Sequence, residues 1–169
     1  MHNRRELIGA LAASGAALGS SAVVAAPAAI DLAKVSKETD VACLYHCDFG
    51  DPQRFSQMLQ NMLNHYSAYD FDAFKLKLVV VAHGAGIKFF LSDRTGTPWE
   101  KESLDPELYQ RFTGLTKYGA EGYLCQITYK RLNIDPAKTR TDPFLKLVPS
   151  GVATVAELQT KGFAYLKIG

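Results

Sequence analysis

Five short runs of mainly apolar residues are spaced along the chain, and each has the length of a β-strand. They are rich in β-branched and aromatic residues and are bounded by Gly, Pro or Asp, which is typical of buried strands. The run LKLVVVA is apolar almost throughout, as expected of a parallel strand that is covered on both faces. The predicted strands cover residues 41–47, 76–82, 121–125, 145–148 and 163–168.

Between these runs, the apolar positions change to a helical period. After Asp51 and Pro52, which form a typical helix start, apolar residues recur at spacings of three and one. These residues are Phe55, Met58, Leu59, Met62, Leu63 and Tyr66. Asp105 and Pro106 start a second helix in the same way, and Gly119 ends it. Further helical segments are expected at 87–91, 126–132 and 152–160.

The alternation of strands and helices predicts an α/β fold. We expect a three-layer sandwich with a mostly parallel, five-stranded sheet and helices on both faces. A length of 169 residues suits one domain plus a short appendage. Residues 41–169 carry the predicted elements, and the polar segment 29–40 is interpreted as a tether.

The first 28 residues have the pattern of an export signal. Arg4 and Arg5 precede an Ala- and Gly-rich stretch, 7–26, that is uncharged. This pattern resembles a twin-arginine signal with cleavage after Ala28. An uncleaved membrane helix is the alternative, but Gly, Ser and Ala make the stretch only modestly apolar. We therefore expect a periplasmic protein, exported by the twin-arginine route, with no membrane contact after cleavage.

Composition narrows the possible functions. The formal net charge is +2 and no Lys/Arg-rich block occurs, so we expect no nucleic-acid partner. The three cysteines form no C-x-x-C pair, which excludes a zinc ribbon and a thioredoxin-like motif. Gly84-Ala85-Gly86 lacks the third glycine of a dinucleotide fingerprint, and no motif indicates a cofactor.

Histidine and cysteine residues that could take part in chemistry lie where three predicted strands end. The first strand ends at His46-Cys47, the second at His83 and its Gly84-Ala85-Gly86 turn, and the third at Cys125. Ligands of open parallel sheets bind beyond the carboxyl ends of the strands. If these three strands are neighbours, their side chains line one pocket.

Cys125 is the main candidate because it lies at a strand-to-helix junction. Free N–H groups at the start of the next helix would stabilise a thiolate, which can attack sulfur; an inert buried cysteine is the alternative. His83 is a candidate proton carrier or electrostatic partner of that thiolate, or else a structural histidine that caps its loop. Gly84 and Gly86 are candidate ligand-binding positions because glycine allows close backbone approach and positive φ.

Cys43 and Cys47 lie four residues apart on one strand, so they share a face. Cys43 is expected in the core, whereas Cys47 is either a resolving thiol for Cys125 or a small apolar filler. A site for copper or zinc made by Cys47, His83 and Cys125 is a third, less favoured hypothesis. His46 is expected on the other face of its strand. The spacing is not diagnostic of a metal, and we assign no metal ligand.

Three segments resemble the DsrE/DsrF-like family: VVVAHGAGIKFFL, GYLCQITYKRLNI and LVPSGVATVAELQTKGFAYLKIG. Their order and spacing cover nearly all of residues 41–169. The resemblance implies a three-layer domain that assembles as a homotrimer or homohexamer. It also implies sulfur-relay chemistry, in which a cysteine persulfide carries sulfur, and by position that cysteine is Cys125.

The expected function is therefore periplasmic sulfur handling, with sulfane sulfur held as a persulfide on Cys125. The partners would be a sulfur donor or acceptor protein, or a small sulfur compound. We expect a carrier or binding protein rather than a turnover enzyme. The alternatives are a non-catalytic, oligomeric module that binds a small ligand or metal, and a structural subunit whose pocket is vestigial.

Overall fold

Five parallel strands form one sheet in the order β4-β3-β2-β1-β5 in the computed structural model, which describes residues 25–169. The strands are β1 (Val41–Cys47), β2 (Leu76–Ala82), β3 (Glu121–Cys125), β4 (Leu145–Val148) and β5 (Ala164–Lys167). Each registered pair of neighbours is parallel. The predicted sheet is confirmed, and β1, β2 and β3, whose ends carry the candidate residues, lie side by side.

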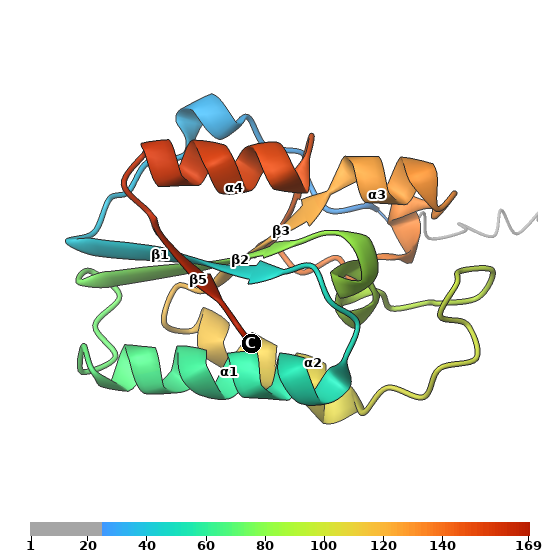
Figure 1. Ribbon diagram of the computed structural model, residues 1–169, viewed down its shortest axis with the longest axis horizontal. Helices are drawn as coiled ribbons and strands as arrows, with labels where there is room; N and C mark the ends of the chain where they lie inside the picture. The colour runs from blue at the N-terminus through green and yellow to red at the C-terminus, as the bar shows by residue number, and fades with distance from the viewer. Residues whose placement is uncertain (1–24) are drawn as a thin grey trace, which may run out of the picture.

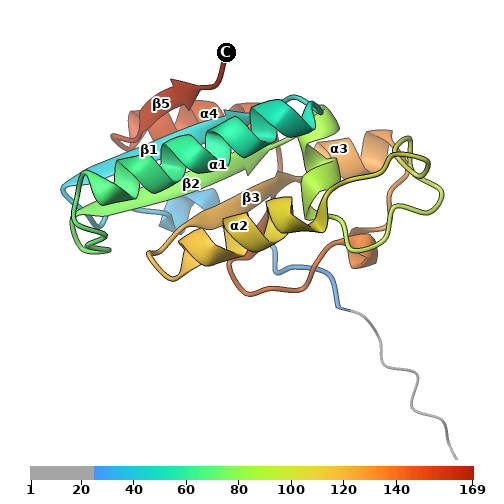
Figure 2. The same ribbon diagram turned by 90° about the horizontal axis from the view of Figure 1, so that it is seen from below.

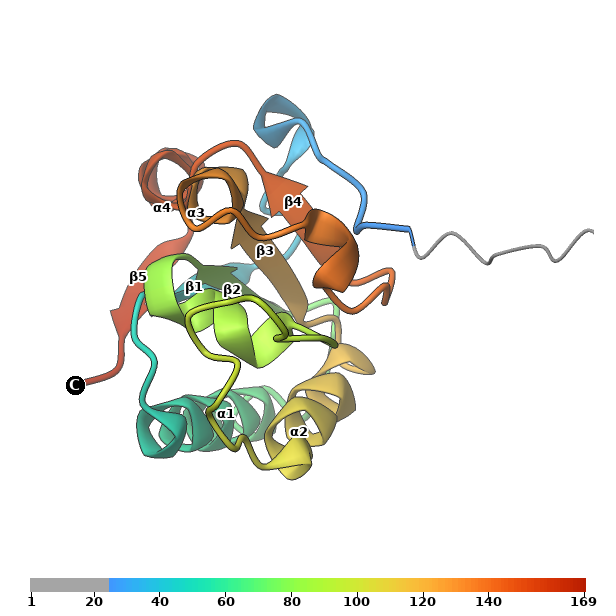
Figure 3. The ribbon, with the colours of Figure 1, turned by 90° about the vertical axis from the view of Figure 1, so that its right-hand side faces the viewer.

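Helices cover both faces of this sheet. The α-helices are α1 (Pro52–Ser67), α2 (Pro106–Thr116), α3 (Gln126–Arg131) and α4 (Gly151–Thr160), and the 3-10 segments are η1 (Leu32–Lys34), η2 (Gly84–Phe90) and η3 (Pro136–Lys138). Figure 1 shows α1 and α2 below the sheet and α3 and α4 above it. The view from below in Figure 2 shows α1 and α2 running across one face, and the end view in Figure 3 shows the sheet between the two helical layers. The predicted three-layer sandwich is thus confirmed.

The two long helices begin where their capping residues predict. The Asp51 carboxylate accepts the backbone N–H of Gln53, and the Asp105 carboxylate accepts that of Glu107. In each helix proline follows the cap, at a position where its missing N–H costs nothing. The apolar stripe of α1 is buried against the sheet, except that Leu63 at its margin is exposed.

The strands separate two hydrophobic layers. On the face covered by α1 and α2, here the α1 face, lie Cys43, Tyr45 and Cys47 of β1. On the opposite face, here the α4 face, lie Leu44 of β1 and Leu158 of α4. Because successive side chains of a strand point to opposite faces, His46 belongs to the α4 face. The same rule places Cys125 on the α4 face, next to Leu124 on the α1 face.

The segment interpreted as a tether packs against the domain. The Ile30 N–H donates to the Leu147 carbonyl at 3.0 Å, so the segment runs along the edge formed by β4. Leu32 is buried in the layer on the α4 face, and the Lys161 Nζ donates to the Val35 carbonyl at 2.8 Å. These contacts join the first described residues to the domain.

The predicted export signal, residues 1–28, lies almost wholly outside the described residues. Within residues 25–169, none of the helices has the length and apolar character needed to cross a membrane.

Candidate functional site

A pocket of about 280 Å³ opens at the carboxyl ends of β2 and β3. Three of the five predicted site residues, His83, Gly84 and Cys125, line it. Thr128 and Arg131 of α3 and Ser150 before α4 complete its polar lining, and the remaining residues, Ile127, Leu132 and Val152, are apolar. The structure therefore brings the predicted thiol, imidazole and glycine turn together at the expected edge of the sheet.

The pocket lies where the chain leaves two neighbouring strands in opposite directions. After β2 the chain enters η2, which packs into the layer on the α1 face. After β3 it enters α3, which lies above the sheet together with α4 (Figure 1). Parallel sheets form ligand crevices at such divergence points, because no connection covers the strand ends there.

Cys125 forms part of the pocket wall. It is the last residue of β3, and α3 begins with the next residue. Only 4% of Cys125 is exposed, and its side chain makes no capping hydrogen bond to α3. The thiol is thus covered by protein yet borders a cavity large enough for a small molecule.

His83 does not cap the turn that follows it. Its backbone is extended and its side chain makes no capping hydrogen bond, although η2 starts at the next residue. Instead, the Nε2 atoms of His83 and His46 lie 2.6 Å apart in a hydrogen bond. The first residue of α4 packs closely on the ring, since a Cβ on Gly151 would lie 2.8 Å from the His83 Cβ and 2.9 Å from its Cδ2.

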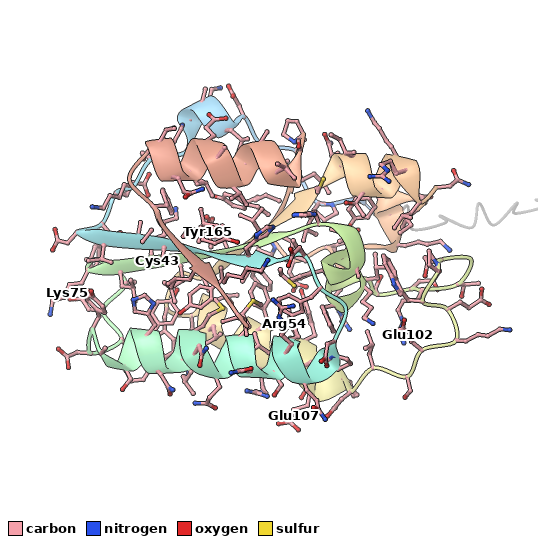
Figure 4. The ribbon with its side chains drawn as sticks, in the orientation of Figure 1. Cys43, Arg54, Lys75, Glu102, Glu107 and Tyr165 are labelled. Carbon is pink, nitrogen blue, oxygen red and sulfur yellow. The ribbon has the colours of Figure 1, made fainter. Side chains whose placement is uncertain are left out.

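His46 is the residue that the sequence analysis left out of the site. Its ring lies 4.8 Å from the His83 ring, centroid to centroid, and its Nδ1 hydrogen-bonds the Tyr165 hydroxyl at 2.8 Å. Tyr165 comes from β5, which pairs with β1 on the side away from β2. Figure 4 shows Tyr165 on the side of the sheet nearer α4, with Cys43 on the side nearer α1. Neither contact could be foreseen without the strand order.

Burial and the nearby Asp48 carboxylate act in opposite directions on the two imidazoles. Burial lowers the pKa of both His46 and His83, and the nearby Asp48 carboxylate partly offsets this. Burial also opposes ionisation of Asp48, but His46 and Lys167 bring its pKa below the usual value. The Asp48 carboxylate lies 3.6 Å from Lys167 Nζ. Near neutral pH the imidazoles are therefore neutral and Asp48 is ionised.

The two glycines of the turn have different roles. Gly84 has a φ of +55°, which favours glycine, and its N–H donates to the Thr128 hydroxyl at 3.0 Å across the pocket. Gly86 lies outside the pocket lining. A Cβ there would be 2.1 Å from the Cys47 carbonyl oxygen and 2.8 Å from the Cys47 Sγ. Gly86 thus permits close packing of η2 on the end of β1.

Cys47 lies apart from Cys125. It is fully buried on the α1 face, whereas Cys125 borders the pocket on the α4 face. Burial raises the pKa of the Cys47 thiol well above its usual range and also raises that of Cys43. The ligand set Cys47, His83 and Cys125 is not assembled, and within residues 25–169 no group of three or more His, Cys, Asp or Glu side chains could hold a metal ion.

Larger hollows, of about 430 and 490 Å³, lie at the amino ends of the strands. Both are open and are bordered by Glu38, Lys77 and Glu121. Lys77 Nζ lies 3.8 Å from Glu38 and 3.4 Å from Glu121, so the one lysine pairs with both carboxylates. No thiol or imidazole lines either hollow or a third one, of about 410 Å³, beside α3, which leaves the pocket at Cys125 as the candidate site.

The comparisons with known proteins agree with this fold. A solved protein of unknown function from Methanobacterium thermoautotrophicum superposes with a TM-score of 0.61 at 22% identity, over 76% of this chain and 99% of that one. No curated protein matches the sequence. Residues 41–168, which include the whole sheet and the pocket, match the DsrE/DsrF-like family. The chain therefore belongs to the DsrE/DsrF-like family.

Proposed function

We propose that this protein is a periplasmic sulfur carrier that holds sulfane sulfur as a persulfide on Cys125. One observation carries the proposal: Cys125 and His83 line the same pocket, whereas the other two cysteines are buried on the opposite face. The proposal is also supported by the resemblance of the family to sulfur-relay proteins. The twin-arginine-like segment supports export, and it would carry the folded domain to the periplasm.

The proposed loading step transfers one sulfur atom without net oxidation. His83 removes the thiol proton of Cys125, and the thiolate attacks the outer sulfur of a donor persulfide, R–S–SH. A new S–S bond forms as the donor S–S bond breaks, and the departing R–S⁻ receives the proton. The products are Cys125–S–SH and R–SH. Unloading to an acceptor thiol is the same step in reverse.

The pocket suits temporary storage of a persulfide. Its lining is mainly apolar, with Ile127, Leu132 and Val152 around the thiol, so bulk water and stray thiols have restricted access. The donor or acceptor is a protein or a small sulfur compound that reaches this opening. We include in the proposal the homotrimeric or homohexameric assembly that the family resemblance implies.

A module that binds a small ligand is the second candidate. The mainly apolar lining and the volume of about 280 Å³ favour it, because such pockets typically hold small apolar molecules. Under this reading Cys125 packs against the ligand and forms no covalent bond.

Intact mass spectrometry distinguishes the two functions. The protein is treated with inorganic polysulfide, and its mass is compared with that of the Cys125→Ser variant. Cys47→Ala is the matched control, because Cys47 lies on the other face of the sheet. We expect gains of whole sulfur atoms that reductant removes, in the native and Cys47→Ala proteins only. An equal gain in Cys125→Ser, or no gain in any protein, contradicts the carrier function and favours the ligand-binding module.

A further inference from the structure

A row of hydrogen-bonded side chains leads from the surface to the pocket. The Tyr165 hydroxyl bonds His46 Nδ1 at 2.8 Å, and His46 Nε2 bonds His83 Nε2 at 2.6 Å. The three residues come from β5, β1 and the end of β2, which are adjacent in the sheet. Tyr165 is 37% exposed, whereas His83 lines the pocket that contains Cys125.

The contact between the two Nε2 atoms restricts the protonation of both rings. When both imidazoles are neutral, one hydrogen lies between the two nitrogens, so one Nε2 donates and the other accepts. If His46 donates, its Nδ1 accepts from the Tyr165 hydroxyl and His83 carries its own hydrogen on Nδ1. If His83 donates, His46 donates from Nδ1 to the Tyr165 oxygen and the His83 Nδ1 has no hydrogen. Only the second arrangement makes His83 Nδ1 a base.

The Nδ1 atom is the nitrogen that His83 has available for chemistry. His46 occupies the Nε2 atom, and His83 Nδ1 has no hydrogen-bond partner among residues 25–169. A base in the pocket must therefore act through Nδ1, and the state of that atom depends on the hydrogen between the two rings.

We propose that Tyr165, His46 and His83 form a proton relay between solvent and the pocket, in which His46 is a positioning residue that sets the tautomer of His83. The inference rests on the proposed function, because the proton it moves is the one that Cys125 releases. It extends that function by naming the route of the proton and two residues, His46 and Tyr165, that lie outside the pocket lining.

The relay balances its protons at each step. His83 Nδ1 takes the thiol proton, and His83 passes its Nε2 hydrogen to His46 Nε2. His46 then gives its Nδ1 hydrogen to the Tyr165 oxygen, which releases its own hydrogen to water. One proton has left the pocket, and the row has changed from the second arrangement to the first. The reverse sequence returns a proton to the departing thiolate and restores the base.

Charged groups around the pair are placed to moderate its protonation. Asp48 favours a proton on both His46 and His83, and Lys167 and Arg54 oppose one on His46. Arg54 is held at this end of the sheet because its Nε donates to the Ile168 carbonyl at 2.8 Å. Gly151 of α4 packs on the His83 ring from the other side. The pair is thus held by three strands, the C-terminal segment and the start of α4.

Nitrogen-detected NMR of the native protein tests the relay without any substitution. At neutral pH we expect His46 and His83 to be neutral, with one protonated Nε2 between the two rings, and to titrate as a coupled pair. Two protonated Nε2 atoms, or two independent titrations, would overturn the proposal.

Thiol alkylation tests the functional connection. The rate of Cys125 modification by iodoacetamide is followed against pH in the native protein and in His83→Gln, His46→Gln and Tyr165→Phe. We expect His46→Gln to slow the reaction at pH 7 by about tenfold, through partial loss of the general base, and to shift the pH profile. Tyr165→Phe should change the profile in the same direction and by less. His46→Gln with an unchanged profile contradicts the relay.

His65→Gln is the matched control. His65 Nδ1 also hydrogen-bonds a tyrosine, Tyr45, at 3.1 Å, but Tyr45 lies on the α1 face away from Cys125. Its alkylation profile should equal that of the native protein. Because alkylation and NMR require no sulfur donor, they test the relay even if polysulfide does not load Cys125. Failure of the relay and failure of the carrier function are therefore separable.

Discussion

Cys47 and Cys125 lie on opposite faces of one sheet, although β1 and β3 end at the same edge. Cys47 is fully buried on the α1 face, and Cys125 borders the pocket on the α4 face. β2 lies between the two strands. A disulfide needs Cβ atoms about 3.5–4.5 Å apart, so the two thiols cannot join while the sheet is intact.

This separation predicts the response to oxidation. With excess oxidised glutathione, we expect one mixed disulfide at Cys125 and no bond between Cys47 and Cys125. Peptide mapping without reduction measures both products. Recovery of a disulfide-linked Cys47–Cys125 peptide from folded protein would support Cys47 as a resolving thiol. It would also contradict the separation of the two thiols.

The contact between Gly151 and His83 predicts opposite effects for two glycine substitutions. Gly151→Ala places a Cβ 2.8 Å from the His83 Cβ, and we expect a loss of about 1–3 kcal/mol in the free energy of unfolding, as for other overpacked positions. Gly114→Ala in α2 is the matched control, since a Cβ there has no neighbour within 4 Å. It should gain about 0.5–1 kcal/mol from helix propensity.

Urea denaturation measures both values. The Gly151→Ala variant should also change the NMR signals of His46 and His83, because the substituted methyl displaces the ring of the pair. Equal stabilisation by the two substitutions would show that α4 does not press on His83.

The lowered histidine pKa values predict how stability varies with pH. Burial lowers the pKa of His46, His65 and His83 in the folded protein, whereas unfolded histidine has a pKa of about 6.5. Between the folded values and 6.5 the unfolded chain binds more protons, so the free energy of unfolding falls as the pH falls. This loss begins as the pH drops through about 6.5 and ends below the folded pKa values.

Urea denaturation at a series of pH values between 7.5 and 5 measures this loss. The double variant His46→Gln, His83→Gln should show a smaller decline than the native protein, since only His65 then contributes among these three. A decline as steep as the native one would place the responsible groups elsewhere. Asp48 and Asp93 have pKa values below their usual ones, so the stability that they contribute is lost mainly at pH values below this range.

Much of the fold is readable in the sequence because the signals are local. Four strands have the predicted bounds: β1, β2, β3 and β4. Each is a mainly apolar run that is followed by a polar residue or a turn. Three helices, α1, α2 and α4, start at their Asp or Ser caps for equally local reasons. The last strand is shorter than predicted, Ala164–Lys167 instead of 163–168, because the residues at both ends of the run lie outside its pairing with β1.

The candidate site was only partly predictable, for a reason that concerns parallel sheets in general. The period of two shows that His46 and Cys47 point to opposite faces. It does not show which face holds the pocket, because both faces of such a sheet are covered and apolar. The sequence pattern therefore predicts Cys47 at the site and not His46, although His46 is the one in contact with His83. The partner Tyr165 depends on the position of β5 beside β1, which no local pattern encodes.

The alternation along β1 also makes the chemistry of this edge sensitive to a change of a single residue in strand length. An insertion of one residue between Asp40 and Cys43 that moved β1 by one position would turn Cys47 to the α4 face, where Cys125 lies. His46 would then point into the apolar layer between the sheet and α1. The edge would then hold two thiols and one imidazole in place of one thiol and two imidazoles. Substitution is thus not the only route by which this pocket could gain a second thiol, since a shift in register is enough.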